Sequence, residues 1–206
     1  MAARGRAGDS AGVTASASPP EAAGEGAGVS GVGGARNPLS AAIEIVDHAP
    51  TVGAVLSSAC RALAAVLGAQ AASISKLVGD VIVQIAEETP PGTTLVIGYG
   101  YLVSDYPLTA VVLERSEPRA VSVFDQDADP SEAALLRDLG YDALLMLPLE
   151  VGGREWGLVE IYDRGERRFR PQDAEAAARL VERTALRIDE LHRRDPRDRR
   201  FGRVAP

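Results

Sequence analysis

The spacing of apolar residues predicts two helices at the start of the folded part of the chain. Between Thr51 and Gly68 the apolar residues recur every three or four positions, which is the period of an amphipathic helix. Gly68 follows the last of them, as is common at a helix end. A shorter helix precedes this one, because Asn37 and Pro38 form a cap and first-position pair and Pro50 interrupts the pattern.

Two pairs of segments then change to the period of β-strands. The segments "AASISKL" and "VIVQIAEE" flank Gly79-Asp80, and "ALLMLPLEV" and "EWGLVEIYD" flank Gly152-Gly153. Two-residue turns of this composition suit the twist of antiparallel strands, so each pair predicts a β-hairpin. Between the hairpins, "TTLVIGYGYLV" indicates a further extended segment and "RAVSVF" a short strand.

Three more helices complete the pattern. Residues 107–115 have helical spacing, Asp129-Pro130 opens a helix through Leu139, and Pro171 starts a long final helix. Strands bracketed by helices at both ends predict an α+β fold, in which helices lie on one face of an antiparallel sheet.

The two ends of the chain differ from this central part. Residues 1–36 are rich in Ala, Gly, Ser and Pro without any period, which predicts a disordered leader. Residues 193–206 carry six Arg and two Asp and are expected to form a solvated basic tail, with an anionic partner as the alternative. The predicted domain therefore spans residues 37–192.

Composition narrows the classes of function. A net charge of −7 argues against a nucleic-acid groove, and no apolar run is long enough to cross a bilayer. A single Cys excludes an internal disulfide framework and suits a reducing compartment. We therefore expect a cytoplasmic protein whose partners are neither nucleic acid nor membrane.

Four segments in the right order resemble a GAF domain of the stand-alone actinobacterial type, over roughly residues 45–192. They are "LAAVLGAQAASISKL", "SDYPLTAVVLERSEPRAVS", "GYDALLMLPLEVGGREWGLVEIYD" and "FRPQDAEAAARLVERTALRI". The resemblance implies a twisted antiparallel sheet. Terminal helices would pack on one face and pair between subunits, while short helices and loops would roof a pocket on the other face.

The roof predicted from this resemblance includes the segment "SDYPLT". Pro107 at a helix start accounts for the turn by backbone physics alone. The resemblance adds that this turn belongs to the roof, so Tyr101, Asp105, Tyr106 and Thr109 are candidate ligand contacts from the roof. These side chains would cover either a ligand or only apolar residues.

The floor of the predicted pocket includes one carboxylate. Strand alternation places Trp156, Leu158, Glu160 and Tyr162 on one face of "WGLVEIYD", opposite the face that suits close helix packing. A buried carboxylate is costly unless it is paired or hydrogen-bonded. Glu160 is therefore a candidate polar anchor for a ligand, the alternative being a rim position open to water.

The titratable residues do not predict an enzyme or a metal site. Cys60 lies on the apolar stripe of its helix and is expected to be a core residue, and one Cys cannot form and resolve an intramolecular disulfide. This argues against the sulfoxide reductases that resemble the fold, and the position of Cys60 argues against a thioether-linked bilin. His48 and His192 lack a third clustered ligand. We expect no catalytic residue, no metal and no cofactor.

The sequence thus predicts a sensory or regulatory module that binds a small molecule, forms a homodimer through its terminal helices and passes its signal to a partner protein. The alternative is a dimerisation or protein-docking module with a filled pocket. A cavity lined by Tyr101 or Glu160 would favour sensing, and a packed interior would favour docking.

Overall fold

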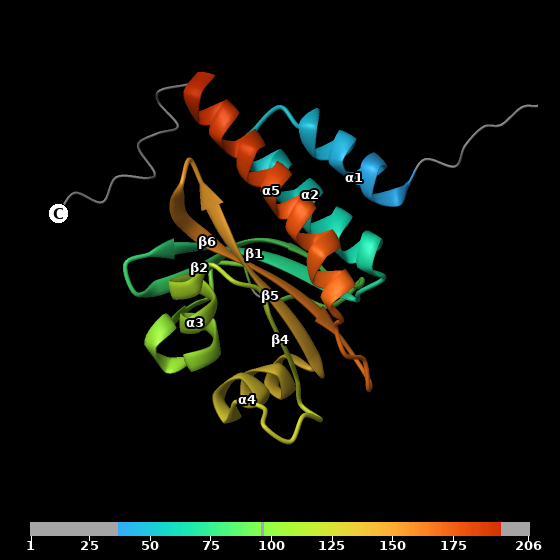
Figure 1. Ribbon diagram of the computed structural model, residues 1–206, viewed down its shortest axis with the longest axis vertical. Helices are drawn as coiled ribbons and strands as arrows, with labels where there is room; N and C mark the ends of the chain where they lie inside the picture. The colour runs from blue at the N-terminus through green and yellow to red at the C-terminus, as the bar shows by residue number, and fades with distance from the viewer. Residues whose placement is uncertain (1–36, 96, 195–206) are drawn as a thin grey trace, which may run out of the picture. The chain divides into compact units, whose positions relative to one another are not determined.

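The centre of the molecule is a six-stranded antiparallel sheet (Figure 1). The computed structural model describes residues 37–95 and 97–194, so the predicted leader lies outside the described residues. The strand order is β3-β2-β1-β6-β5-β4. The strands are β1 (Ala71–Val78), β2 (Val81–Glu88), β3 (Gly100–Leu102), β4 (Arg119–Ser122), β5 (Ala143–Val151) and β6 (Arg154–Asp163).

Helices cover both faces of this sheet, as Figure 1 shows. One face carries α1 (Pro38–Asp47), α2 (Val52–Leu67) and α5 (Pro171–Arg194). The other face carries α3 (Pro107–Arg115) and α4 (Pro130–Leu139), with the 3₁₀ helix η1 (Val103–Asp105) before α3. We call the second layer the roof. The predicted α+β class, with terminal helices on one face and short helices on the other, is confirmed.

The helix ends follow from local side-chain chemistry. The Thr51 hydroxyl accepts a hydrogen bond from the Ala54 amide at 3.2 Å at the start of α2, and Asp129 caps α4 in the same manner. Gly68 and Gly140 end these two helices in the left-handed conformation, which glycine adopts without strain. The predicted boundaries of both helices are therefore confirmed.

The two predicted hairpins form and join at the middle of the sheet. Strands β1 and β6 are neighbours, so the first and last strands of the chain pair there, with Ser73 opposite Glu160. The backbones of β1 and β6 approach each other closely at Gly157, where a Cβ atom would lie 2.0 Å from the carbonyl oxygen of Ser75. Only glycine fits this position without moving the backbone of β1.

Each face of the sheet carries its own core. The helix-side core lies between the sheet and α1, α2 and α5, and its fully buried members include Val55, Leu63, Ile74, Leu147, Val159, Ile161, Leu180 and Ile188. The roof-side core lies between the sheet and the roof, and it includes Ile82, Val112, Leu136, Tyr141, Leu144, Met146, Leu158 and Tyr162.

Trp156 lies on the other face from the one that strand alternation predicts. It packs against the helix-side core, not the roof-side core. The pairing of β5 with β6 steps from Leu149 opposite Gly157 to Glu150 opposite Glu155. Trp156 is thus an extra residue in β6, and a bulge of this kind shifts which side chains face which way.

The long extended segment predicted before Pro107 is mostly irregular. Among the described residues of this segment, only Gly100–Leu102 forms a strand, β3, at one edge of the sheet. Among the described residues, no helix is both long and apolar enough to cross a membrane.

Candidate functional site

A buried carboxylate lies at the centre of the roofed face of the sheet. The Glu160 side chain on β6 is 2% exposed. The hydroxyls of Ser73 and Ser75, on the neighbouring strand β1, donate to its Oε2 at 3.3 and 3.4 Å. The Tyr101 hydroxyl donates to its Oε1 at 3.2 Å from the edge strand β3. Side chains from two other strands, β1 and β3, therefore converge on this carboxylate of β6, and Ser73 and Ser75 share a face because they are two residues apart along β1.

Aromatic rings surround this carboxylate. The Tyr101 ring meets the Tyr106 ring edge-on, with centroids 4.7 Å apart. Burial and the nearby Glu160 carboxylate raise the pKa of Tyr101 and of Tyr162 well above the ordinary value, so both phenols stay protonated. A protonated phenol is a hydrogen-bond donor, and Tyr162 also hydrogen-bonds Glu160.

A second buried carboxylate comes from the roof. Glu132, in the first turn of α4, is 1% exposed. Its Oε1 accepts hydrogen bonds from the backbone N–H of Thr109 at 2.8 Å and from the Thr109 hydroxyl at 3.1 Å. Tyr106, the N-cap residue of α3, makes no side-chain cap bond. Glu132 of α4 therefore caps the N-terminus of α3, and the dipole of α3 favours a negative charge at that end.

The two carboxylates share one electrostatic environment. Burial raises the pKa of Glu132 to about 7, against the opposing effect of the two Thr109 hydrogen bonds. Burial also raises the pKa of Glu160, against the hydrogen bonds that the hydroxyls donate. Within residues 37–95 and 97–194, no Lys or Arg forms an ion pair with either group.

Three of the five residues predicted from the sequence meet in this cluster. Tyr101 and Glu160 are hydrogen-bonded. The Thr109 hydroxyl contacts the sulfur of Met146 at 3.5 Å, and Met146 lies opposite Glu160 in the pairing of β5 with β6. Tyr106 joins only through its ring contact with Tyr101. Asp105 is exposed at the end of η1.

Sequence reasoning missed four members of the cluster, which are Ser73, Ser75, Glu132 and Tyr162. The two serines alternate along β1, so they were accessible to the same argument that singled out Glu160. Glu132 falls within the helix that Asp129-Pro130 opens, and its role depends on a contact between two helices that periodicity does not report.

One further polar atom of the roof-side core is without a partner. Tyr141 is fully buried, its ring packs on Tyr162 at 5.2 Å between centroids, and no hydrogen-bond partner for its hydroxyl lies among the described residues. Buried hydroxyls are normally satisfied. The roofed face therefore holds one buried hydroxyl whose hydrogen bond the described residues do not supply.

The thiol and the imidazoles stand apart from this cluster. Cys60 is buried in the helix-side core, and burial raises the pKa of its thiol to about 12, so it is an inert core residue as predicted. His48 hydrogen-bonds the carbonyl of Glu44 at 2.7 Å. In the described part of the chain, no group of three His, Cys, Asp or Glu side chains is placed to hold a metal ion.

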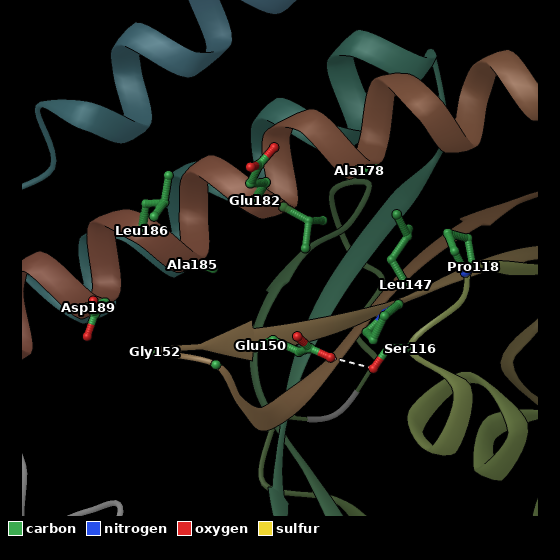
Figure 2. Close-up of a pocket in the computed structure, with 13 residues that line it drawn as sticks. Ser116, Pro118, Leu147, Glu150, Gly152, Ala178, Glu182, Ala185, Leu186 and Asp189 are labelled. Carbon is green, nitrogen blue, oxygen red and sulfur yellow. Dashed lines mark hydrogen bonds between the residues drawn. The ribbon is translucent and has the colours of Figure 1, made fainter.

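A cavity of about 410 Å³ lies elsewhere, on the helix side of the sheet (Figure 2). It runs between α5 and strand β5, and none of the five predicted ligand residues lines it. We call it the α5 groove, and its lining residues are Ser116, Pro118, Leu147, Pro148, Glu150, Gly152, Gly153, Ala178, Val181, Glu182, Ala185, Leu186 and Asp189.

A curled antiparallel sheet with helices on one face and a roof on the other defines an α+β sandwich of the kind that the sequence resemblance implied. Comparison with family models matches residues 51–188 to the GAF domain. The chain therefore belongs to the GAF domain family. None of the curated protein sequences compared with it matches significantly.

Solved structures share this fold at low identity. The phycoerythrobilin-bound GAF domain from a cyanobacterial phytochrome aligns with a TM-score of 0.66 and 19% identity, over 76% of this chain and 95% of that one. The phycocyanobilin-bound counterpart gives 0.65 and 17%, over 76% and 94%. The chromophore-binding domain of the bacteriophytochrome RpBphP3 from R. palustris gives 0.68 and 13%, over 76% of this chain and only 60% of its own.

Proposed function

We propose that this chain is a sensory or regulatory GAF module that binds a small molecule between the sheet and the roof, with Glu160 as its polar anchor. The observation that carries the proposal is the buried pair of carboxylates, Glu160 and Glu132. Hydroxyl groups hydrogen-bond to both of them, and no cation among the described residues pairs with either. The ligand replaces part of this hydrogen-bond network when it binds.

The chemistry of the cluster favours a ligand that donates hydrogen bonds. A buried carboxylate is costly unless a charge or several donors compensate it. The donors on Glu160 lie at 3.2 to 3.4 Å, longer than the usual distance of about 2.7 Å for hydroxyl donors. An amine or amide N–H at this point would make shorter, charge-assisted hydrogen bonds.

The path of a signal follows from the strand that carries Glu160. Its neighbours Val159 and Ile161 point to the opposite face and belong to the helix-side core. Both that core and the α5 helix that follows β6 would respond to a displacement of the strand. A ligand that binds one arrangement of β6 better than another shifts the population of the two.

The bilin ligands belong to the neighbours, as their names state. The single Cys of this chain, Cys60, is buried in the helix-side core, on the face of the sheet opposite the roof. A thioether to a ligand over Glu160 would have to pass through the sheet. The proposed ligand is therefore held without a covalent bond.

The remaining features of the proposal concern assembly and output. The module acts in the cytoplasm without catalytic activity of its own and signals through a partner protein. It forms a homodimer through its terminal helices, where Ile45 of α1 and Leu186 of α5 leave 59% and 46% of their surface exposed. Large apolar side chains at the surface are typical of interfaces when they cluster.

A second function, a protein-docking module, is supported by the α5 groove. This cavity is open between elements and lies on the face away from Glu160. The cluster around Glu160 would then be a structural polar core, and Tyr101 would only cover apolar residues.

Thermal shift assays with amine- and amide-bearing metabolites separate these functions. We expect the melting temperature of the full chain to rise with one such class, because a ligand that binds only the folded state stabilises it. The rise should disappear in Glu160→Gln and persist in Glu155→Gln, an exposed control on the same strand. An unmoved melting temperature, together with a Tyr106→Ala variant that changes stability alone, would contradict ligand sensing.

A further inference from the structure

The α5 groove is built from one face of the last helix and one edge of the sheet. Ala178, Glu182, Ala185 and Asp189 recur at helical spacing, so they line a single stripe of α5. Figure 2 shows Glu150 of β5 across the groove from this helix, hydrogen-bonded by the Ser116 hydroxyl. Small side chains on α5 leave the space, and carboxylates border it.

The lining of the groove is acidic and apolar, without any basic residue. Its charged members are Glu150, Glu182 and Asp189, and its apolar members include Leu147 and Val181. Among the described residues, Glu150 and Glu182 form no ion pair, while Asp189 pairs with Arg193 at 2.7 Å. Such a groove suits an extended segment that alternates arginines with an apolar anchor.

We propose that the segment 197–204 of this same chain, "RDRRFGRV", docks in the α5 groove. The segment carries four arginines, one aspartate and the aromatic Phe201. Its net charge of +3 suits the acidic groove, where Glu150 and Glu182 are the carboxylates without an ion pair among the described residues. Phe201 supplies an apolar side chain for the space between Leu147 and Val181. The proposal is independent of the ligand proposed over Glu160.

The length of the chain allows this return. The α5 helix ends at Arg194, and Glu182 lies about 18 Å back along its axis, at 1.5 Å per residue. Phe201 lies seven positions beyond Arg194, and an extended chain spans up to about 23 Å over that length. Proline disfavours a helix interior, so the Pro196 position in the sequence is compatible with the proposed return.

An arginine contact at the end of the helix already points in this direction. The guanidinium of Arg193 donates to the Asp189 carboxylate, at the end of the groove nearest the helix terminus. The arginines that follow in sequence would continue this pairing towards Glu182 and Glu150. A docked segment would cover part of α5, including the exposed Leu186. It would therefore compete for that surface with the proposed homodimer contact and with any partner protein.

Paramagnetic relaxation enhancement tests the proposal on the full chain. A nitroxide is attached to Gly202→Cys, while the native Cys60 stays unlabelled because it is buried and its thiol pKa is about 12. We expect the methyl signals of Leu147, Val181 and Leu186 to lose most of their intensity. Methyl groups of Val112 and Leu136, in the roof-side core, should keep theirs.

Charge reversal supplies the matched control. The double variant Glu150→Lys and Glu182→Lys should restore the groove signals, as should salt near 1 M, where the Debye length is about 3 Å. The double variant Glu155→Lys and Glu175→Lys reverses two exposed carboxylates outside the groove and should restore nothing. Groove signals that stay intact in the labelled chain would overturn the proposal. Broadening found only between labelled and unlabelled molecules would overturn it too, because a second copy would then be the occupant.

Discussion

The two faces of the sheet differ in what they bury. The helix-side core is built from aliphatic side chains, small residues and the rings of Phe169 and Trp156. The roof-side core surrounds two carboxylates, Glu160 and Glu132, with several hydroxyls. An apolar core stabilises a fold by itself, whereas buried carboxylates cost free energy unless something compensates them. The comparison suggests that one face maintains the fold and the other carries the function.

The largest expected effect is at the junction of the two faces. Gly157→Ala would place a methyl carbon 2.0 Å from the Ser75 carbonyl oxygen, where β1 and β6 support both cores. We expect a loss of about 4 kcal/mol or more in the free energy of unfolding, as for other severe backbone clashes. Urea denaturation followed by circular dichroism measures it. Gly53→Ala, at an open position in α2, should be neutral or stabilising, and an equal loss there would contradict the account.

A truncation in the helix-side core comes next. Leu63→Ala removes a side chain that is 1% exposed and should cost about 2 to 5 kcal/mol. The same denaturation experiment applies, with the exposed Leu102→Ala as control, for which we expect less than about 0.5 kcal/mol. Ligand-induced stabilisation should survive in both variants. Its loss in Leu63→Ala would remove the proposed separation between the two faces.

The roofed face should make the free energy of unfolding depend on pH. The pKa of Glu132 rises from 4.5 to about 7 on folding, so the unfolded chain releases the proton first and stability falls as pH rises through this window. The contribution amounts to about 3 kcal/mol, at 1.36 kcal/mol per pKa unit. Glu132→Gln should remove it. The free energy of unfolding, measured from pH 4 to 8.5, should therefore fall less steeply in this variant than in the wild type. Parallel curves, or the same flattening in the exposed Glu175→Gln, would refute this assignment.

The smallest expected effect concerns one donor to Glu160. Tyr101→Phe removes the hydroxyl that donates to Oε1 and should cost about 1 kcal/mol. It should also raise the pKa of Glu160 further, because a hydrogen bond that lowers it is lost. Isotope-edited infrared spectroscopy of the carboxyl groups follows that titration. Tyr99→Phe, at an exposed tyrosine near the same edge, is the control.

Local chemistry made most of the fold predictable, and tertiary contacts limited the rest. Proline, glycine and capping residues such as Asp129 mark element ends because their effects act within a few residues. Alternation along β6 placed Glu160 on the roofed face for the same reason. It misplaced Trp156, because the bulge there depends on pairing with β5. The role of Glu132 as a cap of α3 was not predicted, because its partner, Thr109, lies 23 positions away on another helix.

The most direct test of the central claim is native mass spectrometry of the full chain purified from its own host, comparing the wild type with Glu160→Gln. The account predicts a small molecule that accompanies the folded wild-type protein, is released on denaturation and is absent from the variant. The same spectra report whether the chain is a dimer. A wild-type protein that carries no small molecule, or a molecule retained equally by Glu160→Gln, would contradict a ligand site over Glu160.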